Sequence, residues 1–284
     1  MDCPHCGKHI EKPKVKIIGL MKVFSGEEWL RASVMSILPF VEKVMLLTSN
    51  VSWIGGKGNP SISIVKQLVA EYPDKIEHLE HDESNQLIHC MFGFEHIKRN
   101  YDCDFIQLID SDELWDAENY QKALAYLAKY PDALAYRTQM FTYIKSPFYR
   151  IDPPEPLKPV CFINAKLKDM GNQPRGCSIK PFVIMPDIWC HHFVFVRSHF
   201  NKVLEKLIQS HVSESQSYER MDRWIPECWN KLPDWNKELF PNGIHPAIGY
   251  GHHWKSIKKV GIEDLPEILD DPDYRYIFDF GEEE

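Results

Sequence analysis

The sequence has no apolar run close to the ~18 residues that a membrane-spanning helix needs. Its first residues, MDCPHCGKHIEKPK, are polar and lack the apolar core of a signal peptide. Basic residues do not outnumber acidic ones, and the net charge is -8, which disfavours broad binding to nucleic acid or to an anionic membrane. These absences predict a cytoplasmic protein with no membrane span.

Disulfide frameworks and standard phosphate-binding loops are also missing. The eight cysteines are scattered, apart from Cys3 and Cys6, and this usage is typical of reduced thiols. The glycine-rich stretch 48–60 matches neither a Walker loop nor G-x-G-x-x-G. No second C-x-x-C completes a zinc site. Cys3, Cys6 and His9 are therefore either three ligands of a zinc site completed from elsewhere, or part of a tail without metal.

What the sequence does contain is a regular alternation of short apolar runs and helical patterns. The 284 residues suffice for one large domain or two small ones, and a 44% hydrophobic content is ordinary for a globular protein. Strands are expected at 14–21, 44–47, 75–79 and 105–109, with helices between them. The order β-α-β-α-β-α-β predicts an α/β fold with a parallel sheet and right-handed crossovers.

The first helix has an N-terminal signal. Ser25 followed three residues later by Glu28 forms the pattern of a capping box, and an apolar face follows it. We therefore expect this helix to begin at Ser25 and to end before Pro39.

The stretch Phe105–Trp115, FIQLIDSDELW, carries the clearest chemical signal. An apolar strand runs directly into Asp110, Asp112 and Glu113. Ligands bind at the carboxyl ends of strands in open α/β sheets, and two converging carboxylates suit Mn²⁺ or Mg²⁺. The alternative is that an aspartate here only caps the following helix at 116–130.

The second half of the sequence differs from the first in composition and in the pattern of its apolar residues. A strand is expected at 133–143, followed by proline-rich and aromatic segments, a pair of histidines at His191 and His192, and a helix at 198–209. The last third is rich in tryptophan. We expect four parts: a tail (1–12), a nucleotide-sugar-binding half (13–115), an acceptor-side half (116–200) and a helical region (201–284).

In their order and spacing, these motifs resemble the family 2-like glycosyltransferases of the GT-A fold, of a small bacterial or phage type. The similarity is carried by Gly26-Glu-Glu28, by Gly93–Lys98 and by the D-x-D pattern at Asp110–Asp112. It is best over residues 14–115 and continues more loosely through 191–197.

The resemblance implies transfer of a hexose from a nucleotide-sugar donor, with UDP as the first choice, to the hydroxyl of a glycan or another acceptor. Asp112 would bind the metal that bridges the donor diphosphate, and Asp110 would contact the ribose or the metal through water. Glu28 would also lie at the donor. His191 or His192 would complete the metal site, or both are packed core residues. Because strand faces alternate, only one of the two is expected to point at the site.

An inverting transfer, which the resemblance implies, needs a carboxylate that deprotonates the acceptor hydroxyl. Asp187 lies at about the position where the family places its base, Asp169 is the competitor, and both are equally typical of surface aspartates. The chain departs from the family at the end of the second strand, where Thr48 or Asn50 replaces an aspartate. It departs again at Cys90-Met91, where many relatives have Arg-Asn.

Three interpretations remain open at the level of sequence. The first is a metal-dependent glycosyltransferase. The second is the same chemistry on a modified nucleic-acid base, which the net charge disfavours. The third is a GT-A-shaped binding or scaffold module without activity, which the intact acidic cluster disfavours.

Overall fold

The structure, a computed structural model, describes residues 15–52, 58–154, 159–171, 178–211, 226, 229–231 and 256–280. Cys3, Cys6 and His9, and with them the predicted zinc site, lie outside these residues, as do Trp224 and Trp235. Within the described ranges, no helix combines the length and apolar character that crossing a membrane requires.

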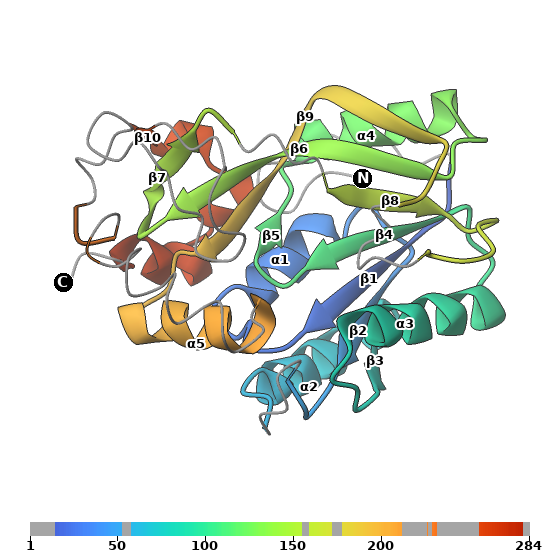
Figure 1. The fold of residues 1–284 in the computed structure, drawn as a ribbon, viewed down its shortest axis with the longest axis horizontal. Helices are drawn as coiled ribbons and strands as arrows, with labels where there is room; N and C mark the ends of the chain where they lie inside the picture. The colour runs from blue at the N-terminus through green and yellow to red at the C-terminus, as the bar shows by residue number, and fades with distance from the viewer. Residues whose placement is uncertain are drawn as a thin grey trace.

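The first half is the predicted parallel sheet (Figure 1). Its strands are β1 (Ile17–Val23), β2 (Lys43–Thr48), β3 (Ile76–Glu80) and β4 (Phe105–Asp110). They are joined through α1 (Leu30–Ile37), α2 (Ile62–Glu71) and α3 (Gln86–Asn100). All three pairings, β1 with β2, β2 with β3, and β1 with β4, are parallel. The predicted α/β fold class is confirmed.

The second half extends the sheet beyond β4 with mostly antiparallel strands. These strands are β5 (Glu113–Leu114), β6 (Ala135–Ile144), β7 (Ser146–Asp152), β8 (Val160–Asn164), β9 (Phe182–Phe195) and β10 (Ser256–Lys259). The described residues of this half also form the helices α4 (Ala117–Lys129) and α5 (Phe200–His211). The long strand β9 pairs with both β6 and β5. The described residues from 262 to 279 form short 3₁₀ helices, whereas the sequence predicted a helical region without distinguishing the type.

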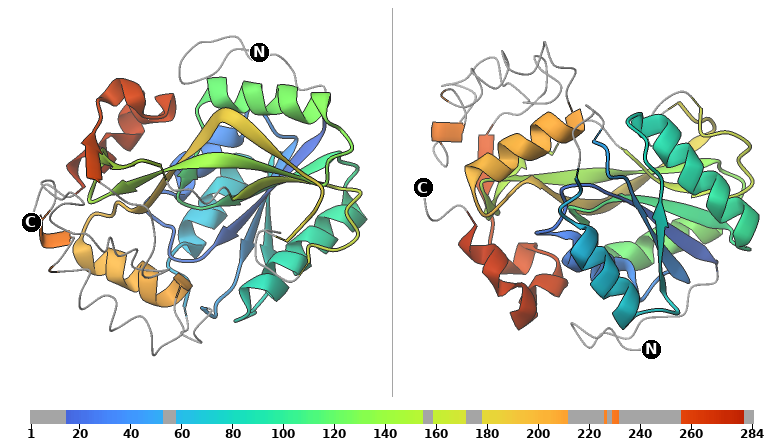
Figure 2. Two further views of the ribbon diagram at one scale, coloured as in Figure 1. Left: turned by 45° about the horizontal axis from the view of Figure 1, so that its top comes forward. Right: turned by 90° about the horizontal axis from the view of Figure 1, so that it is seen from below.

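Helices cover both faces of the sheet. Residues of α1, α2 and α4 share one apolar cluster with β1, β2 and β4, and α3 packs in a second cluster on the other face. Figure 2 shows α5 on the same side as α3, and the C-terminal 3₁₀ segment on the side of α1. At the end of β9, α5 therefore lies on one face of the sheet and the C-terminal 3₁₀ segment lies on the other.

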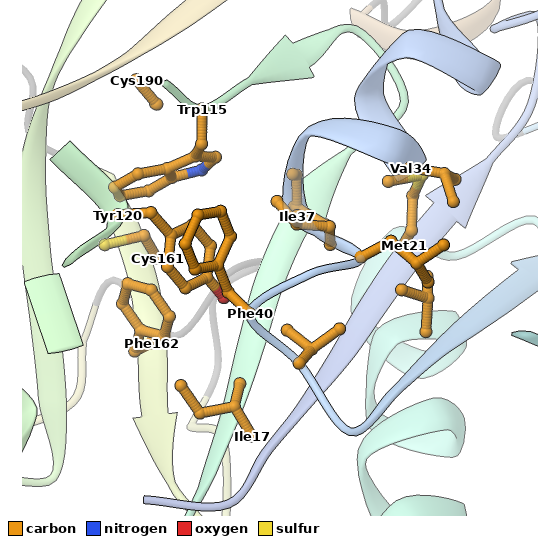
Figure 3. Close-up of a cluster of buried hydrophobic side chains, with 14 of the residues drawn as sticks. Ile17, Met21, Val34, Ile37, Phe40, Trp115, Tyr120, Cys161, Phe162 and Cys190 are labelled. Atoms are coloured by element: carbon orange, nitrogen blue, oxygen red, sulfur yellow. The ribbon is translucent and has the colours of Figure 1, made fainter. Parts of the chain in front are cut away.

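A cluster of aromatic rings fixes the chain immediately after the acidic motif (Figure 3). Phe40 stacks on Tyr120 with ring centroids 4.4 Å apart, and Trp115 lies edge-on to Tyr120 at 5.4 Å. The Ser33 hydroxyl donates to the Glu113 carbonyl at 2.6 Å, and the backbone N–H of Trp115 donates to the Ser36 hydroxyl at 3.2 Å. Helix α1 therefore holds the segment that follows the acidic cluster in place.

The capping-box prediction for α1 is wrong. The helix begins at Leu30, its N-cap is Trp29 without a side-chain cap, and Ser25 has a positive φ of 51°. Glu28 accepts hydrogen bonds from the backbone and hydroxyl of Ser198 instead. The long-range contact has replaced the local one that the sequence pattern predicted.

The order of the strands reverses between β1 and β4. Strands β2 and β3 follow on one side of β1, and β4 lies on its other side. The direction of strand addition therefore reverses between β1 and β4, and ligands bind at the carboxyl ends of such a pair in open α/β sheets.

Candidate functional site

The candidate site begins with one ion pair at this reversal point. Lys22 at the end of β1 and Asp110 at the end of β4 are register partners, and their Nζ and Oδ1 atoms lie 3.1 Å apart. The Lys22 side chain is buried, whereas that of Asp110 is 29% exposed. Asp110 therefore presents a carboxylate to solvent at the edge where a ligand would enter.

The loop after β1 approaches the acidic motif so closely that it requires glycine. A Cβ on Gly26 would lie 2.1 Å from the Ser111 Oγ, far inside van der Waals contact. The Gly26 backbone N–H donates to the Ser61 hydroxyl at 2.9 Å. Three segments, after β1, before α2 and after β4, thus meet at one point.

Asp112 is almost completely buried, with a relative exposure of 1%. Its Oδ2 atom lies 2.5 Å from Arg197 Nη2 and 3.3 Å from Lys206 Nζ, and its Oδ1 atom lies 3.6 Å from His192 Nε2. We call these four residues the Asp112 cluster. Burial by itself raises the pKa of Asp112, but Lys206, His192 and Arg197 together hold it well below its usual value.

The cations of the cluster come from the end of β9 and from α5. Lys202, one turn before Lys206, has its Nζ 2.5 Å from Glu27 Oε1. Glu28 Oε2 lies 4.0 Å from Arg197 Nη1. Burial raises the pKa of Glu27, and the hydrogen bond from Lys202 outweighs this effect and lowers it. Ion pairs therefore join α5 to the loop before α1.

Glu113 supports the backbone of this loop. Its Oε2 atom accepts a hydrogen bond of 3.1 Å from the Asp110 backbone N–H, and the residue is buried. Asp116, not Asp110 or Asp112, caps α4 by accepting from the Asn119 backbone N–H at 2.7 Å. The carboxylates of Asp110 and Asp112 are thus not used as helix caps.

The two neighbouring histidines face opposite sides of β9. His192 belongs to the Asp112 cluster; burial lowers its pKa, but the hydrogen bond and charge of Asp112 raise it above the usual value. His191 is buried with its Nδ1 atom 2.8 Å from the Tyr143 hydroxyl and its Nε2 atom 3.5 Å from Asp116 Oδ2. His191 therefore lies apart from Asp110 and Asp112.

The remaining predicted donor-binding residues lie at the ends of β2 and β3. Thr48 is buried, with its hydroxyl 2.7 Å from His78 Nε2. Asn50 donates to Asp82 through its backbone and to Glu80 through its side chain. Both are at the carboxyl edge of the parallel sheet, as predicted, and their polar atoms are engaged within that edge.

The two aspartates predicted as a general base lie elsewhere. Asp187 is exposed, has a positive φ of 57°, and lies where the pairing of β9 with β6 shifts register, between Ile184 and Trp189. This part of β9 contacts α4, where the Trp189 backbone N–H donates to Asn119 at 3.3 Å. Asp169 is exposed in the loop after β8, where it accepts from the Gly171 backbone N–H. That loop follows Asn164, which pairs with Phe105 at the start of β4, the edge opposite to Asp110.

Four cationic residues of the site were not among the predicted site residues: Lys22, Arg197, Lys202 and Lys206. One signal was present. Lys202 and Lys206 are four residues apart within a predicted helix and must share one face. Nothing in the local sequence shows which element that face meets.

The described residues contain no group of three or more His, Cys, Asp or Glu side chains arranged to hold a metal ion. Of the predicted Mn²⁺ or Mg²⁺ ligands, Asp112 lies 3.6 Å from His192, whereas Asp110 pairs with Lys22 and His191 with Asp116. Arg197 and Lys206 also engage Asp112. Arranged in this way, these residues do not fit a resident divalent cation.

No protein-family model and no curated protein matches the chain. Among solved structures, it is similar to TarS 1-349 of S. aureus, with 10% identity and a TM-score of 0.42 over 79% of this chain and 77% of that one. The complex of TarS 1-349 with UDP-GlcNAc gives 12% identity and a TM-score of 0.41 over 78% of each chain. A further TarS structure gives 12% and 0.42, covering 80% of this chain and 47% of that one. Similarity at this level transfers no residue role.

Proposed function

We propose that the chain is a glycosyltransferase that moves a hexose from a nucleotide-sugar donor to an acceptor hydroxyl. The observation that carries this proposal is the pairing of Lys22 with Asp110 at the reversal point of a parallel sheet, next to the Asp112 cluster. This edge of the sheet carries both carboxylates and cations, and it therefore has the chemistry to hold a nucleoside diphosphate.

Each part of the donor has a chemical counterpart at this edge. Carboxylates accept hydrogen bonds from ribose hydroxyls, and Asp110 is the partly exposed carboxylate of the site. Arginine and lysine donate charge-assisted hydrogen bonds to phosphate oxygens. Thr48 and Asn50 lie along the same edge, at the end of β2, where a base would extend from the ribose.

The transfer itself forms a bond between the acceptor oxygen and the anomeric carbon. The bond from that carbon to the diphosphate oxygen breaks, the electron pair leaves with the nucleoside diphosphate, and a base takes the acceptor proton. Positive charge near the departing oxygen lowers the barrier, because negative charge develops there. Inversion at the anomeric carbon remains part of the proposal, and the anomer of the product, read by NMR, tests it.

Metal dependence was predicted from the D-x-D pattern. A bound Mn²⁺ or Mg²⁺ would supply a Lewis acid for the diphosphate. Its candidate ligands Asp110 and Asp112 are engaged by protein cations, so the proposed reaction does not pass through a metal.

A donor panel tests the function. We expect one of the UDP-, GDP-, CMP- or dTDP-sugars to bind and to be hydrolysed slowly without acceptor, and UDP-GlcNAc is the first to try. Asp110→Asn should weaken donor binding at least about tenfold, because the carboxylate hydrogen bonds are lost. Absence of both binding and hydrolysis for every donor would favour the scaffold interpretation.

A further inference from the structure

The ion pairs around Asp112 show which groups neutralise its buried negative charge. A buried carboxylate without a partner is unstable, so some cation must neutralise it. The D-x-D pattern predicts that this cation is a metal. In the structure, Arg197 and Lys206 lie at 2.5 Å and 3.3 Å from the same carboxylate oxygen.

The positive charges of these two side chains disfavour a metal ion at Asp112. A dication at Asp112 would lie within a few ångströms of a guanidinium and an ammonium group, and like charges at that separation repel strongly in a poorly solvated site. His192 completes the surroundings of the carboxylate on the Oδ1 side, at 3.6 Å. The protein itself therefore supplies the positive charge that a metal would otherwise bring.

One of these two cations, Lys206, lies on a face of α5 that leads to solvent. Lys202 and Lys206 are four residues apart and lie one above the other on the helix. The Lys202 side chain is 38% exposed and that of Lys206 is 11% exposed. His192 is 18% exposed at the other side of Asp112. The row of charge thus leads from the surface inward to the cluster.

We propose that Arg197 and Lys206 bind the diphosphate of the donor in place of a divalent cation, and that Asp112 holds them until the donor arrives. The inference rests on the proposed function, since it concerns the same donor. Arginine matches phosphate oxygens through its planar pair of N–H groups, and lysine contributes a flexible point charge. Together they offset the two negative charges of the bound diphosphate and stabilise the third, which develops as the anomeric carbon–oxygen bond breaks and its electron pair leaves with that group.

Calorimetric titration with UDP, GDP, CDP and dTDP in EDTA, and again in Mn²⁺, tests the proposal. We expect one of these nucleoside diphosphates to bind in EDTA. Lys206→Gln should weaken that binding at least about tenfold, and Lys206→Arg should keep most of it, because the charge is retained. Lys75→Gln is the control, since Lys75 is an exposed lysine just before β3, at the opposite edge of the sheet from Asp110, and it donates to the Val41 carbonyl.

Asp112→Asn separates diphosphate binding by protein cations from binding through a metal, because the two interpretations predict different changes in affinity. If protein cations bind the diphosphate, removing their competing anion leaves binding in EDTA unchanged or tighter. If Asp112 is a metal ligand, the variant weakens Mn²⁺-dependent binding. Thermal melting of each variant confirms folding, and Lys206→Met, which keeps the length of the side chain and removes its charge, replaces Lys206→Gln if that variant does not fold.

Three results would overturn the inference. The first is binding that requires Mn²⁺ in the wild-type chain, which leaves the proposed function intact. The second is binding in EDTA that Lys206→Gln, or Lys206→Met in its place, does not change. The third is the absence of binding for all four nucleoside diphosphates in both conditions, after which hydrolysis in the donor panel decides whether the proposed function stands.

Discussion

Arg197 Nη2 lies 2.5 Å from Asp112 Oδ2, and both side chains are only 2% exposed. The pair joins the end of β9 to the loop after β4, across 85 positions of sequence. Because a buried charge is stable only with its partner, this contact fixes the position of the acidic motif relative to the second half of the chain.

Removing Arg197 should therefore destabilise the fold strongly. We expect Arg197→Gln to lower the free energy of unfolding by about 3–5 kcal/mol, because Asp112 then keeps a buried charge with fewer cations around it. Urea denaturation measures this change. Arg31→Gln is the matched control: Arg31 pairs with Glu71 at 2.6 Å, but that pair is partly exposed and should contribute only about 0–1 kcal/mol. Equal losses in the two variants would contradict the buried-pair interpretation.

The close approach of Gly26 to Ser111 makes a second prediction. Gly26→Ala should be destabilising by about 1–3 kcal/mol, because the new methyl group overlaps the Ser111 side chain and one of the two loops must move. A double-mutant cycle with Ser111→Gly isolates the overlap. The double variant should recover most of the loss, and a purely additive cycle would show that the two residues are not in contact.

Much of the architecture followed from local sequence patterns. The apolar runs and helical periodicities predicted β1 to β4 and the helices between them, because each element buries a face that its own sequence defines. The parallel order then placed Asp110 at a ligand-binding edge through a general property of α/β sheets. Alternation along β9 also predicted that only one of His191 and His192 would face Asp112.

Contacts between residues that are distant in sequence could not be predicted from such patterns. The Ser25–Glu28 motif has the local signature of a capping box, yet Glu28 accepts from Ser198, which is 170 positions away. Likewise, Arg197 and Lys206 meet Asp112 only because β9 crosses beside β5 and α5 turns back toward β1. Asp110 and Asp112 could therefore be assigned to the site from the sequence, whereas Arg197 and Lys206 could not.

The adjacent histidines provide a matched pair of variants. His192→Gln should reduce kcat/KM for the proposed donor about tenfold or more, because it removes an imidazole that can carry positive charge beside Asp112. His191→Gln should instead lower stability, since it breaks the buried contacts with Tyr143 and Asp116. Kinetics and thermal melting of both variants measure the two effects. A kinetic defect confined to His191→Gln would place the site on the opposite face of β9.

Buried His89 should make the fold sensitive to acid. Its Nε2 atom lies 3.3 Å from the Thr48 carbonyl, and burial lowers its pKa to about 4. Between pH 6.5 and pH 4 the unfolded chain therefore binds a proton that the folded chain does not, so stability falls as pH falls through this window. The full shift corresponds to about 3 kcal/mol, lost progressively below pH 6.5.

Urea denaturation of the wild-type chain and of His89→Gln at pH 7 and pH 5 measures this contribution. The wild-type chain should lose more stability than the variant between the two pH values, because glutamine does not titrate. The comparison uses the difference between pH values within each protein, so the packing cost of the substitution cancels. Identical pH dependence in the two proteins would show that His89 is protonated equally well in the folded and unfolded states. Its position beside Thr48 would then have to be solvated.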